Sequence, residues 1–155
     1  MSKSRKRVAA ALETAGLPVE IVELGAARTA QQAADGVGCQ LDQIAKSIIF
    51  AGTESGEALL FLTAGGNMVD ADKAAQVAGE PLAKADAALI RAQTGFAIGG
   101  VSPVGHLTPI RAWLDPRLLE FEEIWAAAGT PNHVFRLKSS ELGKISGAQV
   151  ADFTS

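Results

Sequence analysis

Hydrophobic residues recur along the chain with two periods, and the period changes several times between the two ends. Apolar residues three or four positions apart predict helices, whereas alternation or a short apolar run predicts strands. The predicted strands are 18–24, 44–51, 58–63, 96–98, 110–114 and 133–137. The first predicted helix lies around Val8 and Leu12 and stops at Gly16, and the second is opened by the capping box Thr29–Gln32 and ends near Gly36 and Gly38. Two further helices are predicted at 72–77 and 86–93. A closing helical turn is predicted to be capped by Ser139 or Ser140.

The order of these elements predicts the fold class. Strands and helices are mixed without regular strand–helix–strand alternation, which favours an α+β fold with a mixed, barrel-like sheet flanked by short helices. The chain has 155 residues, 48% of them hydrophobic, and shows no internal repeat or linker. We therefore expect one domain that spans residues 1–155.

Charge and composition narrow the functional classes. A net charge of −3 argues against a strongly basic nucleic-acid binder. Four cations gather at Lys3, Arg5, Lys6 and Arg7, where they are either a solvated first helical turn or a contact for phosphate. No apolar run approaches the roughly 18 to 20 residues of a membrane span, and no signal peptide is evident. With one cysteine, Cys39, the composition fits a reducing compartment, so we expect a cytoplasmic protein without membrane contact.

Lys46 is the most informative single residue. Period-two alternation places it on a strand face with larger apolar side chains, Ile44, Ile48 and Phe50. An ammonium group there is costly unless it reaches water or an anion. Two interpretations stay open: a lysine whose head escapes to solvent at the strand end, and a functional lysine in a cleft.

The stretch GFAIGGVSPVGHLTP, residues 95–109, is dense in glycine and proline. Residues 100–104 resemble a nucleophile elbow but lack its second glycine, and Pro103 removes the amide that such enzymes use in the oxyanion hole. Serine-hydrolase chemistry is therefore disfavoured. A stiff loop of this kind is either a structural turn or a surface whose amides, from Gly99, Gly100, Val101 and Ser102, face a small ligand.

Other chemistry finds little support in the pattern. Cys39 with His106 or His133 offers a thiol nucleophile, but no third orienting residue stands out. The chain has no zinc-type spacing of cysteine and histidine and no phosphate-cradling loop, so we expect neither a metal nor a cofactor.

A strand lysine followed about fifty residues later by TGFAIGGVSPVGH resembles the YbaK/EbsC family. The likeness extends to the helix at 72–78 and to the closing VADF at 150–153. These proteins are trans-acting aminoacyl-tRNA deacylases, related to the editing domain of bacterial prolyl-tRNA synthetase. The resemblance implies hydrolysis of the ester that joins a wrong amino acid to the 3′ adenosine of a tRNA. It favours tRNA for proline carrying cysteine, alanine or another small amino acid, with prolyl-tRNA synthetase as a partner.

The resemblance also implies which residues do the work. Lys46 matches the family lysine and would hold the terminal phosphate or ribose of the tRNA. The loop from Gly99 to Pro103 matches the family loop and would bind the aminoacyl group through its backbone, so the catalytic set is Lys46, Gly99, Gly100, Val101, Ser102 and Pro103. His106 and Asp152 lie near the matched motifs and are the remaining candidate contacts. The alternatives are a tRNA-binding module without catalysis and a small-molecule enzyme that uses Lys46 as an imine-forming amine.

Overall fold

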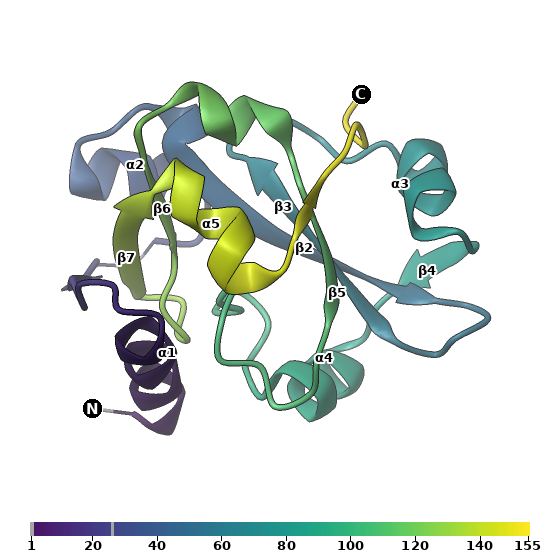
Figure 1. Cartoon of the computed structure of the whole chain (residues 1–155), viewed down its shortest axis with the longest axis horizontal. Coiled ribbons are helices and arrows are strands. Elements are labelled where there is room, and N and C mark those ends of the chain that lie inside the picture. The colour runs from purple at the N-terminus through teal and green to yellow at the C-terminus, as the bar shows by residue number, and fades with distance from the viewer. Residues whose placement is uncertain (1, 26) are drawn as a thin grey trace.

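The computed structural model describes residues 2–25 and 27–155 (Figure 1). The helices are α1 (Lys3–Thr14), α2 (Ala30–Val37), α3 (Ala71–Ala78), α4 (Ala87–Thr94) and α5 (Ser139–Ser146), with 3-10 turns η1 (Leu41–Gln43) and η2 (Pro116–Glu120). The strands are β1 (Ile21–Glu23), β2 (Ile44–Gly52), β3 (Ala58–Ala64), β4 (Leu82–Lys84), β5 (Arg111–Leu114), β6 (Glu123–Ala127), β7 (His133–Lys138) and β8 (Gln149–Val150). None of the described helices is both long and apolar enough to cross a membrane.

The strands form one mixed sheet in the order β1-β7-β6-β2-β3-β5-β8, and β4 pairs with β2 away from this path. The β2–β3 hairpin is antiparallel, whereas β2–β6, β3–β5 and β5–β8 are parallel pairs. Helices lie around the sheet, with α5 crossing in front of it in the view of Figure 1. The predicted α+β fold with a mixed sheet is confirmed.

The pairing of β2 leaves one part of its edge open. β2 pairs with β6 only at Ile44 and Ala45, and with β4 only from Phe50 to Gly52. Between these two contacts, no strand in the described chain lies against residues 46–49 on this side. The sheet therefore forks where β2 and β6 separate, and the fork faces α2 and the loops after α4 and β6.

The core divides into clusters on the two faces of the sheet. The largest packs α1, through Val8 and Leu12, against inward-facing residues such as Leu62 and Phe135. A second lies under α3 and includes Phe61, which stacks on Trp113 with ring centroids 5.0 Å apart. A third joins α2 to Ile44 of β2 and Val134 of β7. Lys46 thus lies on the β2 face shared by the second and third clusters, as alternation predicts.

Two local predictions are wrong. Residues 96–98 are not a strand: Phe96 is fully buried, and the following residues turn so that the Gly100 amide donates to the Ala97 carbonyl at 3.0 Å. Neither Ser139 nor Ser140 caps the last helix, because Lys138 occupies the N-cap position of α5. The Ser139 hydroxyl donates to the Phe121 carbonyl instead.

The N-terminus of α2 keeps only half of the predicted capping box. Thr29 Oγ1 accepts the Gln32 amide at 3.1 Å, as expected at an N-cap. The Gln32 side chain, however, accepts the amide of Arg28 at 2.7 Å rather than that of Thr29. The start of α2 and the residue before it are therefore held in one arrangement at the mouth of the fork.

Candidate active site

A cleft of about 530 Å³ occupies the fork between β2 and β6. Because the sheet is open there, both faces of β2 contribute to its lining: Lys46 and Ile48 from one face, Ala45 and Ser47 from the other. The remaining walls come from β6, the N-terminal turn of α2, and the loops around residues 99–101 and 130–131. The cleft is therefore a junction of segments that are far apart in the sequence.

The described lining residues carry positive charge and no carboxylate. Arg28 and Lys46 are the cationic side chains, His133 is the titratable neighbour, and neither aspartate nor glutamate lines the cleft within the described residues. The positive end of α2 begins at the same wall. In a chain of net charge −3, this arrangement favours a ligand with negative charge or electron-rich oxygens.

One hydrogen bond anchors the Lys46 ammonium. Its Nζ donates to the Asn67 carbonyl at 2.6 Å, and the Asn67 amide group in turn donates to Asp115 at 2.9 Å. Burial lowers the pKa of Lys46, while the charges of Asp115 and Asp42 act in the opposite direction. An ammonium has three donors, so two remain for a ligand once Asn67 is satisfied.

The nearby carboxylates are already engaged with the protein. Asp42 accepts Arg117 Nε at 2.9 Å and the Gly66 amide at 2.7 Å, and the bond with Arg117 is the main reason that the pKa of Asp42 is lowered. Asp115 is only 2% exposed and also accepts the Ala64 amide at 3.1 Å. Lys46 therefore sits near negative charge that holds it in place without forming a direct ion pair with it.

The glycine-rich loop contributes Gly99 and Val101 to the cleft wall. The Gly100 amide is used within the loop, whereas those of Gly99 and Val101 find no acceptor among the described residues. Gly100 instead packs against Thr130, where an added Cβ would come within 2.7 Å of the Thr130 Cα. Of the four residues whose amides could face a ligand, Gly99 and Val101 line the cleft.

Ser102 and Pro103 are buried next to these lining residues and do not themselves line the cleft. Ser102 Oγ accepts the Val104 amide at 3.2 Å, and His106 Nε2 donates to the Ser102 carbonyl at 2.6 Å. Burial lowers the pKa of His106. Its ring packs edge-to-face with that of Phe96, with ring centroids 6.1 Å apart. His106 therefore braces the loop and is not among the residues that line the cleft.

Arg7 of α1 braces the same loop. Its guanidinium donates to the carbonyls of Gly95 at 2.6 Å and Gly105 at 3.3 Å, and lies 4.7 Å from the ring centroid of Phe96. One of the four N-terminal cations is thus a structural clamp. Asp152 lies elsewhere: it is exposed, pairs with Lys73 of α3 at 3.3 Å, and does not line the cleft.

Sequence reasoning missed several lining residues, among them Arg28, Ser47 and Thr130. His133 appeared only as a partner for Cys39, yet it lines the cleft and is hydrogen-bonded to Thr130. Burial lowers the pKa of His133, and the charge of Arg5 acts in the same direction. Cys39 does not line the cleft, and burial raises the pKa of its thiol. The described residues contain no group of three metal-ligating side chains.

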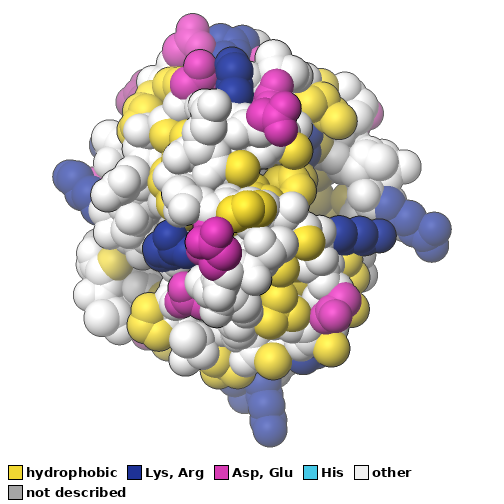
Figure 2. Space-filling model, turned by 90° about the vertical axis from the view of Figure 1, so that its right-hand side faces the viewer, with side chains coloured by type: hydrophobic (Ala, Val, Ile, Leu, Met, Phe, Trp, Pro, Cys, Tyr) yellow, Lys and Arg dark blue, Asp and Glu magenta, His cyan; other side chains and the backbone are white. Residues whose placement is uncertain are grey.

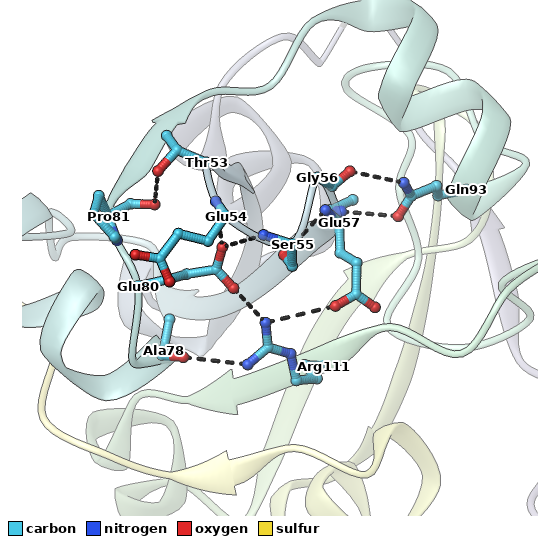
Figure 3. A network of polar contacts seen from close by, with 11 residues as sticks. Thr53, Glu54, Ser55, Gly56, Glu57, Ala78, Glu80, Pro81, Gln93 and Arg111 are labelled. Carbon is cyan, nitrogen blue, oxygen red and sulfur yellow. Dashed lines mark hydrogen bonds and ion pairs between the residues drawn. The ribbon is translucent and has the colours of Figure 1, made fainter.

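A second polar network lies at the other end of β2 (Figure 3). Glu80 is 6% exposed and accepts the amides of Glu54 and Ser55 at 3.1 and 2.9 Å and Arg111 Nη2 at 2.7 Å. These bonds, led by the Ser55 amide, lower the pKa of Glu80 from 4.5 to about 2. The network ties the β2–β3 turn to the segment between α3 and β4. On this face acidic and basic side chains are interspersed and form no single patch (Figure 2).

The fold is thus a mixed sheet with a cationic cleft at a strand fork, and the described lining of this cleft lacks carboxylates. The aminoacyl-tRNA editing domain family matches residues 25–145, and the chain belongs to this family, as a YbaK-like member. Aminoacyl-tRNA editing domains act in translational proofreading.

Individual relatives agree with this assignment. A solved structure described as a candidate trans-editing enzyme for prolyl-tRNA synthetase is 49% identical, with a TM-score of 0.92 over 100% of this chain and 99% of that one. A scaffold from epitope grafting by computational design is 48% identical, with the same TM-score and the same coverage. The uncharacterized protein YwhH of Bacillus subtilis is 34% identical over 122 residues, 79% of this chain and 77% of its own.

Proposed function

We propose that this protein hydrolyses the aminoacyl ester of mischarged tRNA in trans, acting on tRNA for proline that carries cysteine, alanine or another small amino acid. The observation that carries the proposal is the meeting of Lys46 with Gly99 and Val101 in one cleft whose described lining lacks carboxylates. The 49% identity to a candidate trans-editing enzyme for prolyl-tRNA synthetase supports the choice of tRNA.

In the proposed reaction, water attacks the ester carbonyl carbon and the bond to the ribose oxygen breaks. One proton of the water ends on that ribose oxygen, and the amino acid leaves as a carboxylic acid that ionises to the carboxylate by releasing the second proton to solvent. In this proposal the amides of Gly99 and Val101, which have no acceptor among the described residues, stabilise the oxyanion, which needs donors but no charged group. Lys46 uses its two remaining donors on the terminal phosphate or ribose and so orients the ester.

No side-chain carboxylate in the described lining serves as a general base. An aminoacyl ester is already activated, so orientation of the ester and a water supplies a large part of the required acceleration. We propose that the substrate assists through its own 2′-hydroxyl. The apolar wall that includes Ala45 and Ala126 sets the size of the accepted side chain, at about 1–3 kcal/mol for each methylene.

We also propose that residues 1–155 act as one editing unit in the cytoplasm, with aminoacyl-tRNA as substrate and prolyl-tRNA synthetase as partner. The family match begins at residue 25, yet Arg7 of α1 clamps the loop that lines the cleft. Removal of α1 should therefore abolish activity even though the family motifs remain.

The test is a panel of tRNA for proline charged separately with alanine, cysteine and proline. We expect rapid loss of at least one noncognate ester and persistence of the prolyl ester. The second candidate, a tRNA-binding module without catalysis, is favoured by the lack of a carboxylate base in the described lining. That module would bind the same tRNAs and protect every ester, which would refute the proposed hydrolysis.

A further inference from the structure

Ser47 is a polar residue of the cleft lining that the proposed reaction does not use. It follows Lys46 on the opposite face of β2, among apolar neighbours such as Ala45 and Ile49. Its Oγ is buried and has no hydrogen-bond partner among the described residues, although the residue as a whole is half-buried and lines the cleft. An unsatisfied buried hydroxyl costs about 1–3 kcal/mol, a cost that alanine would avoid. A partner supplied by a bound ligand accounts for the serine.

The main chain of Ser47 is open on the same side. The Gly52 amide donates to the Glu57 carbonyl at 2.9 Å, and the β2–β3 register continues without a break to Ala45 opposite Ala64. Hydrogen-bonded pairs recur at every second residue of an antiparallel ladder, so the amide and carbonyl of Ser47 point away from β3. They point into the fork, where no described strand pairs with this part of β2.

The substrate of the proposed function brings a group that needs such acceptors. An aminoacyl ester carries an α-ammonium, which must be hydrogen-bonded once it leaves water. The described cleft lining holds no carboxylate to receive it, and Arg28 and Lys46 have the same charge sign. The carbonyl and hydroxyl oxygens of Ser47 are uncharged acceptors at the open edge, and a staggered χ1 change redirects the hydroxyl at little cost.

We propose that Ser47 forms the subsite for the α-ammonium of the aminoacyl group, a positioning role that rests on the proposed function. Alternation puts Lys46 and Ser47 on opposite sides of the β2 edge. Val101 packs in the same core cluster as Ala45, on the Ser47 side. The tRNA end thus lies toward Lys46, the amino acid lies toward Ser47, and the ester crosses the strand edge between them.

The test compares two esters on the same tRNA: the amino acid that the wild type removes fastest, and the α-hydroxy acid of the same shape, which is lactate in the case of alanine. The wild type should cleave the amino ester about 10- to 100-fold faster, as expected for a hydrogen bond to a charged group. Ser47→Ala should lose most of this preference by slowing cleavage of the amino ester alone, whereas Ser47→Thr should retain it. The melting temperature of Ser47→Ala should not fall, because the removed hydroxyl has no hydrogen-bond partner among the described residues.

Three results would count against this subsite. A wild type that cleaves both esters equally needs no ammonium subsite, and a Ser47→Ala variant that slows both esters equally assigns Ser47 a general structural role. A Ser47→Ala variant with the wild-type preference places the subsite elsewhere. A wild type that cleaves neither ester contradicts the proposed function itself, which separates that failure from the other three.

Discussion

Replacement of Gly100 by alanine tests whether the cleft wall depends on close backbone packing. Gly100 is buried, and its φ angle is not in the left-handed region, so alanine meets no backbone strain. The added Cβ would lie 2.7 Å from Thr130 Cα and 2.8 Å from Thr130 C. These are main-chain atoms, which cannot rotate away, so one of the two loops has to move.

The size of the effect follows from these distances. Ordinary contact for a Cβ begins at 3.4 Å, so the two loops must separate by at least about 0.7 Å from the observed 2.7 Å. Overpacking of this kind costs about 1–3 kcal/mol of folding free energy. A displacement near 1 Å in a group that orients a substrate lowers the rate by about 100-fold, so we expect a 10- to 100-fold loss of kcat/KM.

The assay is single-turnover deacylation beside thermal unfolding, with Gly143→Ala as the matched control. Gly143 lies in α5 without a positive φ, and its added Cβ would meet only the Ala148 carbonyl, at 3.6 Å. This control should gain about 0.5–1 kcal/mol from helix propensity and keep full activity. A Gly100→Ala protein with wild-type rate and melting temperature would refute the packing argument.

Two further predictions concern stability and the loop clamp. The depressed pKa of Glu80 means that its carboxylate stabilises the fold fully above about pH 4.5, and this contribution disappears as the pH falls toward 2. Glu80→Gln should therefore melt below the wild type at pH 7, with the gap closing in acid; a gap that stays constant with pH in circular dichroism melts would contradict the assignment. Arg7→Met should lower the melting temperature and the deacylation rate because two carbonyls lose their donor. If Arg7 is a clamp, the salt dependence of tRNA binding stays unchanged, whereas a smaller salt slope would identify it as a phosphate contact.

The central hairpin was predictable because its signals are local. Residues 44–51 and 58–63 are strongly apolar runs separated by an obvious turn, and both became paired strands. Strand β6 was missed: it has only five residues, no turn signal precedes it, and its partners β2 and β7 are set by the tertiary fold. The apolar run at 96–98 predicted a buried strand, but only Phe96 is buried, in a loop that is hydrogen-bonded to Arg7, and Ile98 is exposed.

The candidate site was predictable only in part, because several of its residues come together only in the tertiary fold. Lys46 stands out because a cation in an apolar strand violates the local pattern, and the loop at 99–103 stands out through its glycines and proline. Arg28 and Thr130 are ordinary polar residues in loops, and only the tertiary fold brings them to the cleft. Ser47 gave only a weak indication in the sequence, a hydroxyl on an otherwise apolar strand face. The structure adds that this hydroxyl is buried and has no hydrogen-bond partner among the described residues.

The most direct test of the central claim, that the cleft around Lys46 hydrolyses a noncognate ester, is the single-turnover rate of Lys46→Ala against that of Lys73→Ala. Lys73 is a suitable control, since it is a partly exposed lysine of α3 that pairs with Asp152 outside the cleft. We predict that Lys46→Ala loses at least about 100-fold in deacylation, as expected when a group that orients the ester is removed, while its melting temperature stays near that of the wild type and Lys73→Ala stays fully active. A Lys46→Ala protein that is folded and cleaves the ester at the wild-type rate would contradict the account.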